Sequence, residues 1–368
     1  MDLGMKYNNM QLLSSAQSER KVSQLEKVSS FLLIFIMWIL MGFNTYNADY
    51  EAYQALYHRI SILGTNTDPG IEIGFKYIMY FFSFFTNSYQ VFLCITSLTC
   101  LIFLRYIILL YTNYVSSTLF LFFIFGFFSN AIQLRNFISM ILILFAFYIF
   151  CNNEGIKAYF LYVFIIFIAS LFHVTSLFYL ILIVSKLNKK VIFLIFGIST
   201  VCLAAIRNNI QYFFEDTKFI SYWGNNNATG GMSKTILILA YFSVNLWLVI
   251  KLVKLSKEIP SKNFVDFLVP VNLLVSVSFL LVLLNNNFIR LIRNVYLLNY
   301  VLYSQNLHFM FRKTKIYNYL ILLSYFFFVI FSGYFFTLKG SSADSGFLAL
   351  FKYNMVIESI MNLFSLPT

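Results

Sequence analysis

Long apolar runs alternate with short polar segments along almost the whole chain. A helix needs roughly 20 apolar residues to cross a bilayer, and the longest runs approach or exceed that length: 91–111, 159–184, 235–253, 267–284 and 317–338. Shorter or interrupted runs lie at 28–43, 71–85, 117–128, 137–150, 191–206 and 295–311. The pattern predicts an all-α, polytopic integral membrane protein of roughly 10–12 transmembrane helices, some of them short or broken, with a cavity that faces the outer leaflet.

Two stretches leave the number of crossings open. The run 159–184 is either one tilted helix or two half-helices that meet near His173. The runs 117–128 and 137–150 are short and are separated by the polar segment 129–136. The side of the membrane on which Arg135 lies is therefore not fixed by the pattern.

Basic residues in the polar segments predict the orientation of the chain. Lys and Arg gather in 1–27, 185–190, 251–262 and 312–315, and such segments face the cytoplasm. Residues 1–27 then form a cytoplasmic N-terminal tail without the apolar core and cleavage site of a signal peptide, so the first apolar run serves as the insertion signal.

The same alternation places the remaining segments outside. Residues 28–338 form the transmembrane domain, and its loops 44–70 and 207–233 face outward together with the C-terminal tail 339–368. At 100° per residue, Asn354, Glu358, Ser359 and Asn362 share one side of a helix over about 347–364. We therefore expect an amphipathic helix in the outer interface, and a final spanning helix is the alternative.

The composition excludes a soluble protein. Of the 368 residues, 60% are hydrophobic and only 11% are charged, whereas soluble chains carry about 25% charged residues. The net charge of +12 comes from basic residues in short loops, so it indicates orientation in a membrane and not nucleic-acid binding. The four cysteines lie in or beside apolar runs without metal-ligand spacing, and we expect neither a metal nor another cofactor.

Charged residues inside apolar runs are expensive and are candidates for function. Glu72 and Lys76 are four positions apart in a predicted helix, so they could simply neutralise each other. Glu72 also lies at the mouth of a run, next to water. Arg105 lies near the end of a run, where its side chain can reach the interface. Arg135 precedes an apolar run and belongs either to a functional site or to an ordinary interfacial loop.

Arg290 and Arg293 are three positions apart, so a helix places them on one face. They follow the three asparagines 285–287. Two guanidiniums and several amides at an outer helix mouth suit an anionic phosphate group. The alternative is that both arginines anchor the helix among lipid headgroups.

The remaining candidates are a histidine and an acidic aromatic loop. His173 lies deep in an apolar run, where it is either functional or hydrogen-bonded across helices. Asp49, Tyr50 and Tyr53 fall within one turn of a possible interfacial helix. An acid among aromatic rings just outside the membrane suits a sugar site, although tyrosines also form interfacial belts.

The order of these motifs resembles the EpsG family of bacterial polysaccharide polymerases, which are functionally similar to the Wzy O-antigen and capsule polymerases. The matching elements are Asp-Tyr-Glu-Ala-Tyr at 49–53, Glu-Ile-Gly-Phe at 72–75, Leu-Arg-Asn at 134–136, Phe-His-Val-Thr-Ser-Leu at 172–177, and Arg290 to Tyr296. This chain departs from the family pattern at Ile73 and Phe75, where the family often has Pro and Tyr, and at Asn136, where it usually has Gln.

The resemblance implies a glycosyltransferase in the bacterial cytoplasmic membrane. Its substrates would be undecaprenyl-diphosphate-linked oligosaccharides, which it would join into O-antigen, capsular polysaccharide or exopolysaccharide on the outer face. The expected partners are membrane lipid, a chain-length regulator and a flippase.

The resemblance also assigns roles to the candidate residues. Asp49 would be the first choice for the base and His173 the second. Arg135, Arg290 and Arg293 would bind phosphate, Glu72 would bind a sugar or orient an arginine, and the tyrosines of the acidic loop would contact sugar. A divalent ion shared by Asp49 and Glu72 is the alternative to metal-free chemistry.

Two other classes of protein fit parts of the pattern. A flippase or other transporter for lipid-linked sugars would also need basic residues in the membrane, but it would not need the acidic aromatic loop. A membrane O-acyltransferase acting on surface glycan would use His173 as its base, although the sequence shows no second histidine or acid at a suitable spacing.

The charge pattern predicts a membrane topology that can be tested on intact cells. In variants with single cysteines, a membrane-impermeant thiol reagent should label a cysteine at Asn226 and should not label one at Lys189, because only the former lies outside. The reverse labelling pattern would invert the topology.

Overall fold

The computed structural model describes residues 23–68, 70–206, 232–256, 264–310, 316–338 and 346–364. Most of the N-terminal tail and most of the predicted loop 207–233 therefore lie outside the described residues. Within them the chain is helical, and its one β-type contact is an isolated bridge between Asn44 and Asn354.

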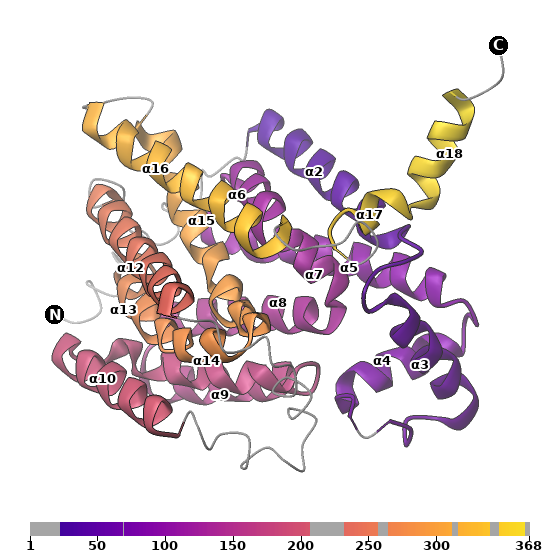
Figure 1. Ribbon diagram of the computed structural model, residues 1–368, viewed down its shortest axis with the longest axis horizontal. Helices are drawn as coiled ribbons and strands as arrows, with labels where there is room; N and C mark the ends of the chain where they lie inside the picture. The colour runs from indigo at the N-terminus through magenta and orange to yellow at the C-terminus, as the bar shows by residue number, and fades with distance from the viewer. Residues whose placement is uncertain are drawn as a thin grey trace, which may run out of the picture.

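The helices follow one another without a repeated unit (Figure 1). They are α2 (Gln24–Gly42), α3 (Tyr50–Leu63), α4 (Ile73–Ser83), α5 (Tyr89–Tyr111), α6 (Val115–Phe122), η1 (Phe123–Phe127), α7 (Phe128–Ile132), α8 (Leu134–Asn152), α9 (Gly155–Ser170), η2 (Val174–Lys186), α10 (Lys189–Ile206), α12 (Met232–Leu255), α13 (Val265–Ser276), α14 (Phe279–Leu284), η6 (Asn286–Ile289), α15 (Arg290–Met310), α16 (Ile316–Gly333), η7 (Tyr334–Leu338), α17 (Ala349–Lys352) and α18 (Met355–Phe364).

The prediction of an all-α polytopic membrane protein is confirmed. Among the described residues, seven helical stretches are long and apolar enough to cross a bilayer: Gln24–Gly42, Tyr89–Tyr111, Val115–Ile132, Leu134–Asn152, Thr235–Leu255, Val265–Leu283 and Ile316–Leu338. Two shorter apolar helices, α9 and η2, add to them.

The run 159–184 consists of two helices that meet at His173. α9 ends at Ser170 and η2 begins at Val174, with His173 in an extended conformation between them. η2 is a 3-10 helix of 13 residues, and this form rises about 2.0 Å per residue. Its length of roughly 26 Å approaches the roughly 30 Å of a hydrocarbon core, so each half can nearly cross.

Contacts between helix ends define two opposite faces of the molecule. On the first, which we call the Asp49 face, the Gln90 side-chain amide donates to the carbonyl of Gly42, 2.7 Å away. This contact joins the end of α2 to the start of α5. On the other, the Glu26 face, the Glu26 carboxylate accepts from the backbone N–H and the hydroxyl of Ser116 at 2.9 and 2.7 Å.

Ends of the predicted cytoplasmic loops gather on the Glu26 face. Tyr111, at the end of α5, contacts the ring of Phe264 with a centroid distance of 5.2 Å. Lys186 lies over the ring of Phe267, 5.9 Å from its centroid, and donates to the carbonyl of Asn153 at 2.8 Å. The charge pattern needs these ends on one face, and the side of the membrane that this face meets stays a prediction.

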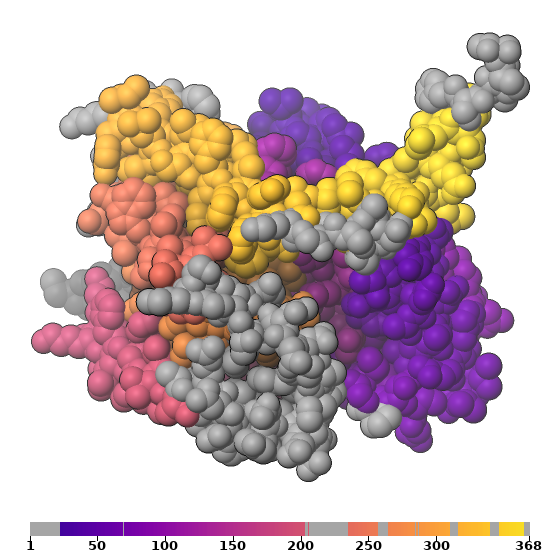
Figure 2. All heavy atoms as spheres, in the orientation of Figure 1, coloured from indigo at the N-terminus to yellow at the C-terminus, as the bar shows by residue number. Residues whose placement is uncertain are grey.

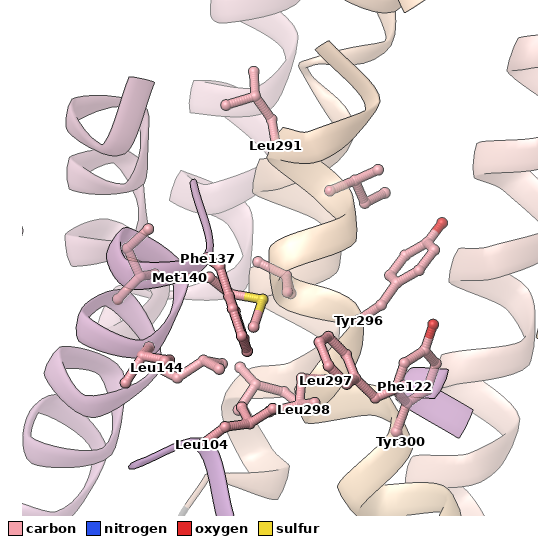
Figure 3. Close-up of a cluster of buried hydrophobic side chains, with 14 of the residues drawn as sticks. Leu104, Phe122, Phe137, Met140, Leu144, Leu291, Tyr296, Leu297, Leu298 and Tyr300 are labelled. Carbon is pink, nitrogen blue, oxygen red and sulfur yellow. The ribbon is translucent and has the colours of Figure 1, made fainter. Parts of the chain in front are cut away.

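Helix α15 lies at the centre of the bundle. Figure 3 shows Leu291, Tyr296 and Leu298 of this helix among side chains of neighbouring helices, including Leu104 of α5, Phe122 of α6 and Met140 of α8. All residues from Arg290 to Gln305 are buried, including several polar ones. Because α15 meets protein on all sides, it can carry polar side chains that lipid would not tolerate.

Buried asparagines connect α15 to its neighbours. Asn299 and Asn272 exchange side-chain hydrogen bonds of 2.9 and 2.8 Å, and Asn245 donates to Asn272 at 3.1 Å. The three residues lie on α15, α13 and α12. Such interhelical amide bonds hold membrane helices together where the hydrophobic effect does not act between them.

Two segments differ from the sequence expectations. The run 71–85 forms only the 11-residue helix α4, which at 1.5 Å per residue is roughly 16 Å long and too short to cross. It pairs with α3 at one side of the molecule (Figure 1). The segment 129–136 is mostly helical, since α7 continues to Ile132 beyond a kink at Phe125 and Gly126, and α8 begins at Leu134.

The predicted C-terminal helix is divided at Tyr353 and Asn354 into α17 and α18. α18 projects from the body of the molecule (Figures 1 and 2), and its Met361 and Leu363 side chains are exposed. An exposed apolar side on a projecting helix fits the predicted interfacial helix, and its position at the outer interface stays a prediction.

Candidate functional site

A buried ion pair between Glu72 and Arg135 forms the centre of the candidate site. One carboxylate oxygen of Glu72 contacts the Arg135 guanidinium. The other oxygen accepts from the backbone N–H of Val174 at 3.2 Å and lies 3.4 Å from Nδ1 of His173. A single carboxylate thus joins the start of α4, the start of α8 and the break between α9 and η2.

Local backbone features explain why Glu72 reaches this position. Gly74 N–H donates to the carbonyl of Leu171 at 2.8 Å, in the break after α9. A Cβ atom at Gly74 would lie 2.8 Å from that same oxygen, so only glycine permits the approach. The N–H of Val174 at the start of η2 then donates to the carboxylate, because the first turn of a helix lacks internal acceptors.

Arg135 lies between the acid and an aromatic ring. Its Nε donates to the hydroxyl of Tyr53 at 3.0 Å, and its guanidinium carbon lies 5.5 Å from the centroid of the Tyr53 ring. The Tyr53 ring in turn packs on Phe75 of α4. These contacts place Arg135 on the Asp49 face, which answers the question of its sidedness relative to the loop 44–70.

Asp49 is half-buried immediately before α3 and lies beside the same cations. Burial raises the pKa of its carboxyl above the ordinary value. The charges of Arg135 and Arg290 and a hydrogen bond with Tyr53 oppose this rise. Burial also raises the pKa of Tyr53 to about 12. A carboxylate with a raised pKa accepts a proton more readily than a solvated one.

Arg290 and Arg293 lie at the N-terminal end of α15, and each side chain is only 5% exposed. Arg293 donates to the Gln133 side-chain carbonyl at 3.3 Å, and its Nε atom has no hydrogen-bond partner within the described residues. The Tyr179 hydroxyl donates to the carbonyl of Leu291 at 2.7 Å and fixes the backbone between the two arginines.

The arginine pair adjoins the ion-paired cluster. The charge of Arg290 acts on both Asp49 and His173. A helix N-terminus and two buried guanidiniums together form a strongly positive environment.

The structure brings most predicted site residues together. Asp49, Tyr53, Glu72, Arg135, His173, Arg290 and Arg293 form one connected group on the Asp49 face. Tyr50 lies apart from the ion pair: its hydroxyl donates to Gln90 at 2.9 Å, and its ring packs on Tyr89.

Lys76 bonds to backbone carbonyls and does not form an ion pair with Glu72. Its amine donates to the carbonyls of Thr67 at 3.0 Å and Asp68 at 3.5 Å. It therefore stabilises the loop before α4.

Sequence reasoning missed the polar residues that support the site. Gln133 holds Arg293, and Tyr179 holds the start of α15. Asn136 and Asn294 exchange hydrogen bonds of 3.2 Å between α8 and α15, beneath the arginines. The available signal was that Gln133, Asn136 and Asn294 each lie within three residues of a candidate arginine.

The described residues contain no group of three or more His, Cys, Asp or Glu side chains that could hold a metal ion. The chemistry that the group offers directly is proton acceptance by Asp49 or His173 and anion binding by the arginines.

Comparison with known sequences identifies the family. The sequence model of the EpsG family matches residues 27–355, which is most of the chain. No curated protein and no solved structure matches the chain.

Gly74 offers a test of the close approach that positions Glu72. Gly74→Ala should destabilise the protein by about 1–3 kcal/mol, because the new methyl group meets the Leu171 carbonyl. Thermal unfolding in detergent would measure the effect. Gly197→Ala is the matched control, since a Cβ at this helical glycine meets nothing within 4 Å. Equal stability of the two variants would contradict the proposed packing.

Proposed function

The chain belongs to the EpsG family, and from this premise we propose that it polymerises polyprenyl-diphosphate-linked oligosaccharides by glycosyl transfer. The product is a bacterial O-antigen, capsular polysaccharide or exopolysaccharide. The reaction takes place at the outer face of the cytoplasmic membrane, which the Asp49 face meets. Undecaprenyl diphosphate is the carrier that both substrates share.

The buried Arg293 side chain is the observation that carries this proposal. Its only hydrogen bond within the described residues is to a neutral amide, and its Nε atom has none. Burying a cation without a counter-ion is costly. A diphosphate would supply the missing negative charge and accept from both guanidiniums of the pair, as arginine–phosphate contacts commonly do.

Asp49 is suited to the proton transfer of the reaction. The acceptor sugar hydroxyl loses its proton to the Asp49 carboxylate as its oxygen bonds to the anomeric carbon of the donor sugar. The bond from that carbon to the diphosphate oxygen breaks, and the diphosphate leaves with both electrons. The negative charge that develops on it is stabilised by Arg290 and Arg293.

In this scheme the ion pair of Glu72 and Arg135 positions Tyr53 beside Asp49. Glu72 fixes the guanidinium of Arg135, which in turn holds Tyr53 beside Asp49. Tyr50 supports the loop through Gln90.

The contact between His173 and Glu72 favours a second candidate function. A carboxylate that orients a histidine is an arrangement that O-acyltransferases also use for a base. Surface glycan separates the candidates: loss of a polymerase leaves single repeat units, and loss of an acetylase leaves glycan of normal length. Loss of a flippase, the transporter alternative, leaves no exported units.

Asp49→Asn keeps the size of the side chain and removes its ability to accept a proton. The rate of polymerisation should fall by about 10²–10⁴-fold. The surface glycan should then consist of single repeat units, while the protein stays in the membrane at normal abundance. Gel electrophoresis of the glycan measures this. Long chains made by this variant would refute the base assignment and would make His173→Gln the next test.

Arg290→Lys and Arg293→Lys distinguish a phosphate clamp from a headgroup anchor. An anchor needs only positive charge, whereas a clamp needs the paired hydrogen bonds of a guanidinium. Each change should lower the rate by roughly 10²–10³-fold and shorten the glycan at unchanged protein abundance.

Arg105→Lys is the control for this pair, because Arg105 donates to Ser30 at 3.1 Å and covers the Phe31 ring outside the site. Its glycan should keep the normal length. If the late arginines tolerate lysine while Arg135→Lys abolishes polymerisation, the diphosphate binds at the start of α8 and the assignment to α15 is wrong.

A further inference from the structure

The C-terminal segment packs on the loop that carries Asp49, although the two are far apart in sequence. Thr45 N–H donates to the carbonyl of Tyr353 at 2.8 Å, and Met355 N–H donates to the carbonyl of Phe43 at 3.0 Å. These two bonds flank the bridge between Asn44 and Asn354. In Figure 2 the α17 region lies against the surface formed by the N-terminal part of the chain.

Asn354 joins the end of α2 to the start of α18 and is fully buried. Its amide nitrogen donates to the carbonyl of Ile39 at 2.9 Å, within the last turn of α2. Its side-chain oxygen accepts from the N–H groups of Val356 at 3.2 Å and Ile357 at 3.3 Å. One amide therefore bonds to backbone groups at the ends of two helices and caps the first turn of α18.

Asn44 continues the connection toward Asp49 and is also fully buried. Its amide nitrogen donates to the carbonyls of Tyr353 at 2.9 Å and Ala349 at 3.0 Å. Its oxygen accepts from the side chain of Asn47 at 2.8 Å. The Asn47 oxygen accepts from the backbone N–H of Asp49 at 3.0 Å.

We propose that Asn44, Asn47 and Asn354 are positioning residues for Asp49, and that they make the C-terminal segment part of the scaffold of the reactive site. This inference rests on the proposed function, in which Asp49 is the base. A turn closed by Asn47 alone would set the local shape of the loop. The additional bond to Asn44 fixes that turn relative to α2 and the C-terminal segment.

Positioning of this kind matters because proton transfer depends on geometry. A displacement of about 1 Å can lower a rate by roughly 10²-fold. The folded protein also loses stability when a buried amide loses its hydrogen-bond partner. The bonds through Asn354, Asn44 and Asn47 therefore act as a unit. Neither Asn44 nor Asn354 contacts the reacting groups, and both act through Asn47.

Loosening the loop would also change the titration of Asp49. The charged and titratable groups that act on Asp49 or that it acts on are Tyr53 on α3, Tyr89 on α5, Arg135 on α8 and Arg290 on α15. Burial is the largest influence and raises the pKa. Admitting water would lower the pKa toward its ordinary value, so the carboxylate would stay ionised to lower pH.

The test uses membranes from cells that carry the full-length protein. The probe is the host's own lipid-linked repeat unit, extracted from a strain that lacks the chain, and polymerisation is measured across a pH series. Asn354→Ala removes the side-chain bonds that join the C-terminal segment to the end of α2 and cap α18. Asn47→Ser keeps a hydroxyl that can accept from the Asp49 N–H but is too short to reach Asn44.

Both variants should polymerise roughly 10–10²-fold more slowly at neutral pH. The acidic limb of the pH profile should move to lower pH. Asn152→Ala is the control, because Asn152 is exposed and its side chain donates to the Tyr148 carbonyl at the far end of α8. Its rate and profile should match those of the unaltered protein. If Asn354→Ala fails to accumulate, Asn354→Ser keeps the cap of α18 and removes only the reach to α2.

Two outcomes would overturn the inference. Either both variants behave like the control, or the rate falls while the acidic limb stays in place, as a purely structural role would give. Failure of the premises looks different. If Asp49 is not the base, Asp49→Asn, which keeps all three asparagines, polymerises normally. If the proposed function is wrong, membranes that carry the unaltered protein do not polymerise the repeat unit at all.

Discussion

The ion pair of Glu72 and Arg135 is the contact on which the arrangement of the site depends. It lies where three separate parts of the chain meet, and its carboxylate is also bonded to the backbone of η2 and lies beside His173. Removing one member of a buried pair leaves an uncompensated charge and costs roughly 3–5 kcal/mol. The surrounding helices are therefore held in one relative position, which is what a preorganised reactive site needs.

The site is formed where helices begin or break. Glu72 precedes α4, Arg135 opens α8, His173 separates α9 from η2, and Arg290 opens α15. Backbone groups at such positions lack helical partners and must find others, so they bind side chains or ligands. In a bilayer, irregular backbone is tolerated only where protein or a water-filled cavity surrounds it. A gathering of helix ends on one face thus places a polar cluster inside an otherwise apolar bundle.

The central position of α15 makes the positive charge of the site tolerable. The arginines at its start are enclosed by protein. Asparagines further along α15 bond directly to α8 and α13, and an asparagine of α13 bonds in turn to α12. These bonds keep a polar helix in the interior without exposing it to lipid. The diphosphate of the proposed substrate would supply the negative charge that the described residues do not place at Arg293.

The sequence by itself determined the all-α membrane fold, because apolar length and period decide whether a segment can cross a bilayer. It also singled out Glu72, Arg135, His173 and the late arginines, because a polar or charged side chain in or beside an apolar run is costly. Asp49 stood out for another reason, as an acid among aromatic residues in a polar loop. Which of them meet was decided only by the tertiary structure. The partner of Glu72 is Arg135 and not the nearby Lys76, and Tyr53 faces the site while Tyr50 faces α5. These contacts join residues tens to hundreds of positions apart, and so does the bond between Asn44 and the C-terminal segment. No local sequence pattern encodes such long-range contacts, since they depend on how all the helices pack together.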